Sequence, residues 1–350
     1  MSAALASLIW RSDTRLQAAL GLAWLSTAVS FTASLNNGLP TIEVAKAALG
    51  MGLFLTALIF LPQKIAHLRA YPAPTLEILA ILICLAFILE KFQVFSMKEI
   101  GLVDWFETRN YTANFDTRPS GLYSEPSWMA LSLIGLSVAM LGKPGRFKPF
   151  AIAISLFCAA WCGSSIGLLM AALVTSWIVV NAPIPVHRRE VRALVKVVSV
   201  FGVILASLAV FPFIDADQAR KILMPFDYGS GVSRFLRPIP YLQDVLARTP
   251  FFGQGLSYMT ERLLGLTGLA VLPVNVMLDT GLFGVAVYGI FIATTLVKMR
   301  ASAFSCLLVM ILLLSLGMQY SPWQAILIVM ISSMSRPSEQ VRAYRAAHRG

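Results

Sequence analysis

Long apolar stretches recur along the whole sequence, and charged residues fall mostly between them. Ten stretches qualify as candidate membrane helices, at residues 16–35, 41–62, 75–92, 126–142, 149–162, 165–182, 196–213, 272–297, 301–318 and 322–335. A helix rises ~1.5 Å per residue, so most of these stretches match the hydrocarbon thickness of a bilayer. The pattern predicts an all-α polytopic membrane protein with about ten transmembrane helices in a single membrane domain, residues 1–350.

The composition agrees with this pattern. Of the 350 residues, 57% are hydrophobic and only 13% are charged. A soluble domain carries about twice that charged fraction. The N-terminal "MSAALASLIW" lacks a basic region and a cleavage site, so we expect no secretory signal peptide. Four cysteines lie in apolar runs without a neighbouring histidine or carboxylate, which predicts packing roles and no metal site: Cys84, Cys158, Cys162 and Cys306.

The charge distribution predicts the orientation of the chain. With a cytoplasmic N-terminus, the inside segments are 1–15, 63–74, 143–148, 183–196, 298–300 and 336–350. Each of them is net basic, as the positive-inside rule requires, and the C-terminus is also cytoplasmic. The net charge of +11 is therefore explained by topology, and nucleic acid is not an expected partner.

Two predicted outside segments are long, at residues 93–125 and 214–271, whereas the other connections are short. Long connections in a compact fold are often functional. Within the second one, apolar residues recur at helical spacing, and Thr249-Pro250 ends the pattern: Ile239, Leu242, Val245 and Leu246. We expect a short amphipathic helix on the outer membrane surface, followed by a glycine turn whose backbone N–H groups can approach a ligand.

Arginines are the candidate ligand-binding residues of these outside segments. Among the basic residues of these segments are Arg109, Arg118, Arg220, Lys221, Arg234, Arg237, Arg248 and Arg262. The guanidinium fork binds phosphate through two parallel hydrogen bonds. On the outer side and at membrane level, such a phosphate most plausibly belongs to a lipid. The alternative is that these arginines bind phospholipid headgroups or pair with carboxylates of the same segments.

Four stretches together resemble one family. They are "RPSGLYSEPSWMALSL" (118–133), "SSIGLLMAAL" (164–173), "SRFLRPIPYLQDVLARTPFFGQGL" (233–256) and "VNVMLDTGLFGVAVYGIF" (274–291). In this order and topology they resemble the signature regions of the O-antigen polymerase and ligase superfamily, the Wzy-type polymerases and the O-antigen ligases. The resemblance covers roughly residues 70 to 335.

The resemblance implies a fold of GT-C-type glycosyltransferase architecture in the bacterial inner membrane, with its active site facing the periplasm. Such enzymes transfer a glycan from undecaprenyl pyrophosphate to a lipid-linked repeat unit (polymerase) or to lipid A core (ligase). They need no cofactor and no metal. A chain-length regulator and a flippase are the candidate protein partners, and membrane lipid surrounds the enzyme.

The resemblance also assigns roles to residues. Arg118 and Arg234 match the family's arginines on the two long segments, and we expect them, with Arg237, to bind the pyrophosphate whose charge grows in the transition state. Gly253 and Gly255 would add backbone donors. Further site candidates within the four stretches are Tyr123, Ser165 and Asn275.

A base or a positioning group is needed for the acceptor hydroxyl. Glu125 is the first candidate, because partial burial at a helix mouth raises the pKa of a carboxyl group. The alternative for Glu125 is a charge that favours the helix dipole ahead of Pro126. Asp279 is the second candidate, and its alternative is a partner for a buried arginine.

One departure from the family favours polymerase over ligase. Ligases usually carry a histidine beside the asparagine that opens the later helix, and here Val274 precedes Asn275. The three histidines, His67, His187 and His348, all fall on the predicted cytoplasmic side.

A transporter or flippase for a lipid-linked substrate is the alternative from another class. It would place charges or broken helices near the midplane, where Asp279 is the deepest acidic residue. Gly281, Gly284 and Gly289 predict close helix packing or room for a polyprenyl chain.

Overall fold

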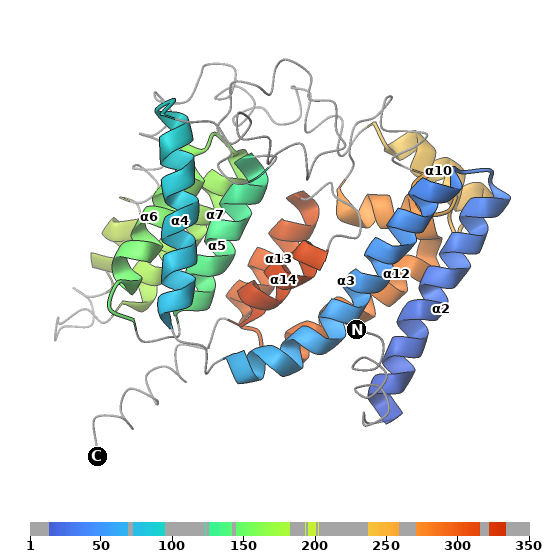
Figure 1. Ribbon diagram of the computed structural model, residues 1–350, viewed down its shortest axis with the longest axis horizontal. Helices are drawn as coiled ribbons and strands as arrows, with labels where there is room; N and C mark the ends of the chain where they lie inside the picture. The colour runs from blue at the N-terminus through green and yellow to red at the C-terminus, as the bar shows by residue number, and fades with distance from the viewer. Residues whose placement is uncertain are drawn as a thin grey trace. The chain divides into compact units, whose positions relative to one another are not determined.

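The computed structural model describes residues 14–68, 73–94, 123, 126–141, 145–182, 193, 195–200, 202, 237–258, 271–315 and 322–333. Every regular element in these ranges is a helix (Figure 1). The helices are α2 (Thr14–Asn36), α3 (Thr41–Leu68), α4 (Ala73–Lys91), α5 (Pro126–Leu141), α6 (Lys148–Trp161), α7 (Ser165–Asn181), α10 (Ile239–Arg248), α12 (Leu272–Lys298), α13 (Ala303–Ser315) and α14 (Pro322–Ser332).

The predicted apolar stretches therefore correspond to helices wherever the structure describes them. Nine of the ten expected spans have a matching helix whose bounds differ by a few residues, and the seventh, 196–213, lies mostly outside the described residues. Of the described helices, three are long and apolar enough to cross a membrane: Gln17–Asn36, Thr41–Pro62 and Leu272–Lys298. Five more are apolar but shorter. An all-helical membrane protein is compatible with this structure, and the count of ten crossings stays a prediction.

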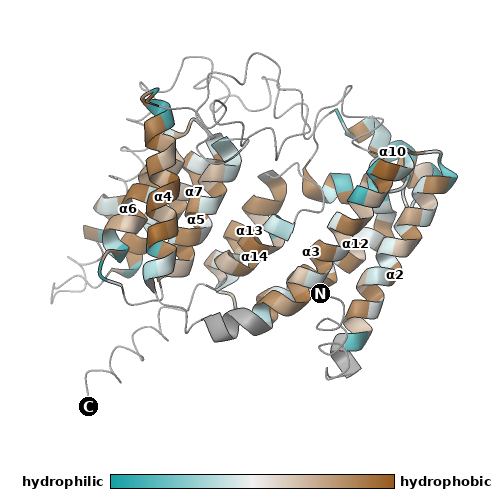
Figure 2. Cartoon of the chain, viewed as in Figure 1, coloured by the Kyte–Doolittle hydropathy of each residue, from teal (hydrophilic) through white to brown (hydrophobic). Residues whose placement is uncertain are grey.

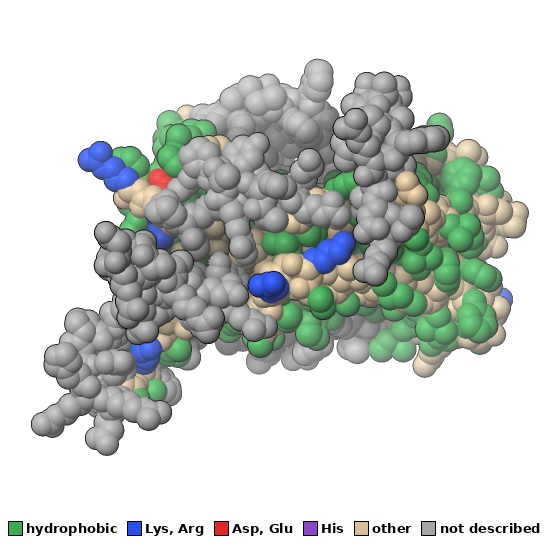
Figure 3. Space-filling model, turned by 90° about the horizontal axis from the view of Figure 1, so that it is seen from below, with side chains coloured by type: hydrophobic (Ala, Val, Ile, Leu, Met, Phe, Trp, Pro, Cys, Tyr) green, Lys and Arg blue, Asp and Glu red, His purple; other side chains and the backbone are tan. Residues whose placement is uncertain are grey.

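The surface of the helices is apolar in the way a lipid environment requires. Hydrophobic residues run along most of α3, α4 and α13 (Figure 2). Leucine side chains such as Leu79 and Leu82 on α4 are exposed at mid-helix. Seen from below, the described surface is mainly hydrophobic with scattered lysine and arginine side chains (Figure 3). Exposed apolar helix faces of this extent are stable only against lipid or another protein.

The chain divides into two compact units. One contains residues Met1–Leu68 and Pro225–Ser332, and the other contains Arg69–Met224 and Ser333–Gly350. The first unit holds α2, α3, α10, α12, α13 and α14, and the second holds α4, α5, α6 and α7. The sequence predicts that the whole chain forms a single membrane domain, and this stays a prediction.

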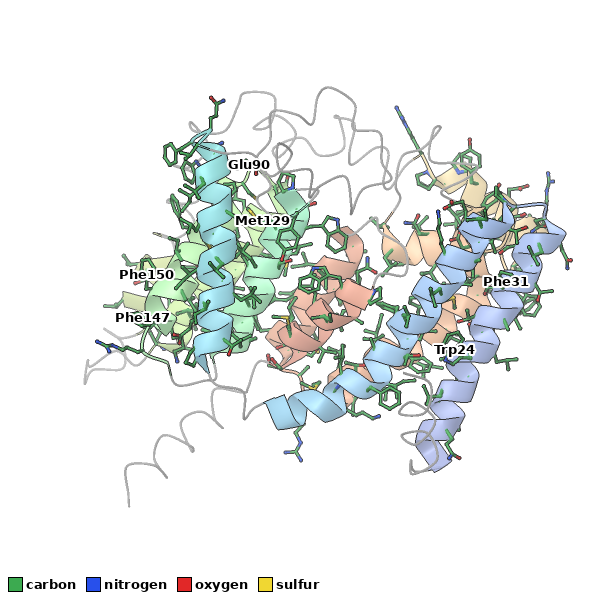
Figure 4. All side chains as sticks on the ribbon, in the orientation of Figure 1. Trp24, Phe31, Glu90, Met129, Phe147 and Phe150 are labelled. Carbon is green, nitrogen blue, oxygen red and sulfur yellow. The ribbon has the colours of Figure 1, made fainter. Side chains whose placement is uncertain are left out.

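In the second unit, α4 and α6 lie side by side and run in the same direction. At one end, Glu77 of α4 accepts a hydrogen bond from the Phe147 N–H ahead of α6 (3.3 Å). At the other end, the Lys91 ammonium group lies 5.7 Å from the centre of the Trp161 ring. Glu90 and Phe147, labelled in Figure 4, mark these two ends. The start of α5 is also near the second end, since Cys162 Sγ lies 3.6 Å from the Pro126 carbonyl oxygen. The ends of α4 and α6 and the start of α5, which the sequence predicts to face outward, thus lie close together in this unit.

In the first unit, too, the helix ends that are predicted to face outward lie at one end. Helices α2 and α3 form an antiparallel pair, in which the Trp24 ring (Figure 4) lies over Gly52. A Cβ atom at Gly52 would be 2.7 Å from this ring, so glycine permits the contact. Farther along, the Thr295 hydroxyl of α12 donates to the Leu58 carbonyl of α3 (3.2 Å). The α2–α3 turn, α10 and the first part of α12 gather at the opposite end, which the sequence predicts to be the outer end.

Candidate functional site

Helix α12 is broken at Gly281, which has φ 64° and ψ −164°. An L-residue with a side chain rarely adopts this backbone conformation. The break frees the last carbonyl groups of the part before Gly281 and the first N–H groups of the part after it. The sequence predicted one continuous span here, and the break at Gly281 departs from that prediction. The close packing predicted for Gly281 is found, against the backbone of Phe251 and Gly253.

The residues Thr249–Tyr258, hereafter the glycine loop, satisfy the freed groups. Gln254 N–H donates to the Leu278 carbonyl (2.9 Å), and Gly255 N–H donates to the Asp279 carbonyl (2.8 Å). Beyond the break, Leu282 N–H donates to the Pro250 carbonyl (2.8 Å), and the Phe283 N–H donates to the Phe251 carbonyl (3.0 Å). Four backbone hydrogen bonds therefore connect the broken helix to the glycine loop. The part of α12 before Gly281 ends against this loop, and the part after Gly281 begins against it.

Three glycines make this contact sterically feasible. Gly253 and Gly255 also have positive φ, 66° and 101°. A Cβ atom at Gly253 would lie 2.7 Å from backbone atoms of Asp279, Thr280 and Gly281. Such distances are too short for a real side chain. The first glycine of the Gly-x-Gly pattern, Gly253, and Gly281 of "LDTGLFG" are thus explained by one close approach of two backbones.

The α2–α3 turn holds the glycine loop from another side. Asn37 Nδ2 donates to the Gln254 carbonyl (2.7 Å). Ser257 Oγ donates to the Glu43 carbonyl at the start of α3 (3.1 Å). A Cβ atom at Gly255 would lie 2.4 Å from the Ser34 Cα atom, so this glycine packs directly on α2. Residues about 200 positions apart in sequence thus meet at the glycine loop.

Helix α10 precedes the glycine loop and confirms the helix predicted from its apolar spacing. Pro238 stands at its N-cap, and Thr249 stands at its C-cap. Val245 is buried against Leu278 of α12. Exposed side chains on α10 include Ile239 and Leu246, and Arg248 pairs with Asp244 at 2.6 Å. The location of α10 on a membrane surface stays a prediction.

Two candidate residues of α12 lie inside the unit. Asn275 and Asp279 are both fully buried. Asp279 is close enough to Tyr288 to act on it electrostatically, and the Tyr288 ring stacks on Phe54 with 5.1 Å between ring centres. The Asp279 side chain is buried in the protein, next to the break, and its role as a base stays a prediction.

The remaining candidates of this unit belong to α10's N-terminal side and to the glycine loop itself. Arg237 is exposed in the turn before α10. The N–H groups of Gly253 and Gly255 donate to the carbonyls of Thr249 and Asp279. Donation from these two N–H groups to a ligand would require the bonds to open, so the role that the structure gives these glycines is close packing. Arg234 lies outside the described residues.

In the second unit, Tyr123 is half-buried, and burial raises the pKa of its phenol, an effect that a hydrogen bond with Ser132 partly opposes. Ser164 caps α7 by accepting a hydrogen bond from Gly167 N–H, and Ser165 is exposed in the first turn. Arg118 and Glu125 lie outside the described residues.

The other glycines predicted to pack closely behave differently from one another. A Cβ atom at Gly284 would meet the Thr280 side chain of the same helix at 1.7 Å. A Cβ atom at Gly289 would have no neighbour within 4 Å, so close packing is not what the structure shows there.

Sequence reasoning missed Ser34 and Asn37 as partners of the glycine loop. The only local signal is the "NNG" turn between two apolar runs, which predicts a connection and not a contact.

No protein-family model matches this sequence, and no curated protein sequence is significantly similar to it.

Proposed function

We propose that this chain is a polysaccharide polymerase that transfers a glycan from undecaprenyl pyrophosphate to a lipid-linked repeat unit at the outer face of the bacterial inner membrane. The observation that carries the proposal is the docking of the glycine loop on the broken helix α12. These are the third and fourth stretches on which the resemblance to the polymerase and ligase superfamily rests. Two weak motifs that contact each other in the folded chain support the resemblance more than either does alone.

The proposed chemistry is carried by arginine. Arg118, Arg234 and Arg237 would hold the pyrophosphate and stabilise the negative charge that accumulates on it as the glycosyl bond breaks. Arg237 precedes α10, which the glycine loop and Val245 hold on α12. Fixed guanidinium groups stabilise developing charge better than mobile ones, because they need no reorganisation during the reaction. Glu125 or Asp279 would act on the acceptor hydroxyl.

The test is reconstitution of the purified protein in lipid vesicles with a lipid-linked repeat unit. A ladder of products on a gel supports the polymerase. A single transfer to added lipid A core, without a ladder, would identify a ligase instead.

The break in α12 favours one second candidate, a transporter for a lipid-linked substrate. Transporters use broken helices whose free backbone groups bind substrate or ions. Here the carbonyls of Leu278 and Asp279 and the N–H groups of Leu282 and Phe283 are already bonded to the glycine loop. The polymerase therefore remains our proposal, and movement of a labelled lipid-linked glycan across vesicles without any ladder would decide for the transporter.

A further inference from the structure

The glycine loop is attached to α12 and to the α2–α3 turn by hydrogen bonds that differ in kind. On α12, it is held by four backbone hydrogen bonds and by glycines that admit no side chain. On the α2–α3 turn, it is held by side-chain hydrogen bonds, from Asn37 to the Gln254 carbonyl and from Ser257 to the Glu43 carbonyl. A substitution can remove the second kind of attachment without disturbing the first.

Asn37 is well placed to control the loop. Its amide bonds Gln254, which lies between the two positive-φ glycines, and Gln254 N–H bonds the Leu278 carbonyl at the end of the first part of α12. One residue is thus held from both sides through its two backbone groups. The glycine loop also continues directly from α10, so its position affects the direction of α10 and of Arg237 before it.

We infer that Asn37 is a positioning residue, which acts through Gln254 to hold α10 and Arg237 before it in the orientation that binds the pyrophosphate. This inference rests on the proposed function, because Arg237 has that role only in an enzyme that uses a pyrophosphate-linked glycan. Asn37 itself is exposed at a turn, so it is not a core residue whose loss unfolds the unit.

The chain offers a matched control at the next position. Asn36 is also exposed, at the end of α2. Asn37→Asp keeps the size of the side chain but puts a carboxylate against the Gln254 carbonyl in place of a donor. Asn36→Asp adds the same charge one residue away. Asn37→Gln keeps the donor on a longer side chain and serves as the conservative variant.

The first measurement does not depend on activity. Trypsin cuts after Arg248, at the junction of α10 and the glycine loop, and mass spectrometry follows cleavage of the Arg248–Thr249 bond in the folded, solubilised protein. In Asn37→Asp the hydrogen bond to the Gln254 carbonyl is lost, and a carboxylate oxygen faces that carbonyl oxygen instead. We therefore expect the Arg248–Thr249 bond to be cleaved about fivefold faster or more in this variant. Asn36→Asp is expected to match the native protein, and Asn37→Gln to fall between the native protein and Asn37→Asp.

The second measurement is turnover in the vesicle assay. We expect kcat/KM of Asn37→Asp to fall about fivefold or more, with little change in Asn36→Asp and partial recovery in Asn37→Gln. Equal cleavage in the two aspartate variants would overturn the attachment. Faster cleavage with native turnover would overturn the positioning role. If the native protein makes no ladder, the proposed function fails and the positioning role fails with it, whereas cleavage still decides whether Asn37 holds the loop.

Discussion

Gly253 and Gly281 lie backbone to backbone: a Cβ atom on Gly281 would be 2.6 Å from the Gly253 nitrogen, and one on Gly253 would be 2.7 Å from the Gly281 nitrogen. The two glycines belong to different stretches of the sequence, one in the loop after α10 and one in an apolar helix. Their contact joins the glycine loop to the break of α12.

Alanine at Gly281 should destabilise the protein strongly. This backbone conformation costs roughly 1–3 kcal/mol for a residue with a side chain, and the added Cβ atom would also lie 2.5 Å from the Phe251 carbonyl carbon. The measurement is the thermal unfolding of purified protein in detergent, followed by size-exclusion chromatography. Gly289→Ala is the control on the same helix, because its Cβ atom meets open space. Alanine there should be neutral or stabilising by roughly 0.5–1 kcal/mol. Equal stability of the two variants would contradict the break at Gly281.

The contact of α10 with α12 should depend on Val245 and not on its neighbour Leu246. Val245 is 1% exposed against Leu278, whereas Leu246 is 46% exposed. Val245→Ala removes buried methyl groups and leaves a cavity, which predicts a loss of about 1–3 kcal/mol in the free energy of unfolding. Leu246→Ala should change it by less than about 0.5 kcal/mol in detergent. Denaturant titration compares the two, and a larger effect at Leu246 would place the opposite face of α10 against α12.

Tyr123 should ionise at higher pH than an exposed tyrosine. Burial raises its pKa above the ordinary value of 10.0. Absorbance titration near 295 nm of native protein and Tyr123→Phe isolates the signal of this phenol. Since the folded state keeps the proton that the unfolded state loses, the contribution of Tyr123 to stability is full below about pH 10 and is lost as the pH rises toward the folded pKa. A difference signal that reaches half of its final size at about pH 10 would show that Tyr123 is exposed.

Glu125→Gln distinguishes a base from a helix-terminal charge. As a base for the acceptor hydroxyl, Glu125 should be needed for turnover, and its amide variant should lose about 100-fold or more of kcat. As a charge at the start of α5, it should change stability by about 1 kcal/mol or less and leave turnover near normal. The assay is product formation in vesicles, with thermal unfolding measured on the same samples. Near-native turnover would assign Glu125 to the helix terminus and leave Asp279 as the remaining base.

The helices were largely predictable, and the break in one of them was not. The apolar run from Leu272 to Lys298 contains good helix formers around its glycines, and a single glycine inside a helix costs only about 1 kcal/mol, so nothing local distinguishes Gly281 from Gly289. The break becomes favourable because the glycine loop supplies hydrogen-bond partners to both helix ends. That contact is tertiary and appears only in the folded chain.

Tertiary contacts also limited what the sequence could predict about the candidate site. The spacing around α10 predicted a helix, because Val245 and its neighbours recur at helical positions, and α10 confirms it. The prediction that the N–H groups of Gly253 and Gly255 face a ligand missed the alternative that another backbone uses them. Asn37 could not be found at all, since its partner lies 217 residues away and is a backbone carbonyl, which any residue type provides.

The measurement that tests the account most directly is the product ladder made by Arg118→Ala and Arg234→Ala in vesicles that contain the lipid-linked repeat unit. Each arginine is proposed to bind the pyrophosphate leaving group, so each variant should fold, elute as the native protein does and make no ladder. Native protein and Arg248→Ala, whose guanidinium is exposed and paired with Asp244, should both make a ladder. Ladders of normal length and rate from both Arg118→Ala and Arg234→Ala would contradict the proposed polymerase site.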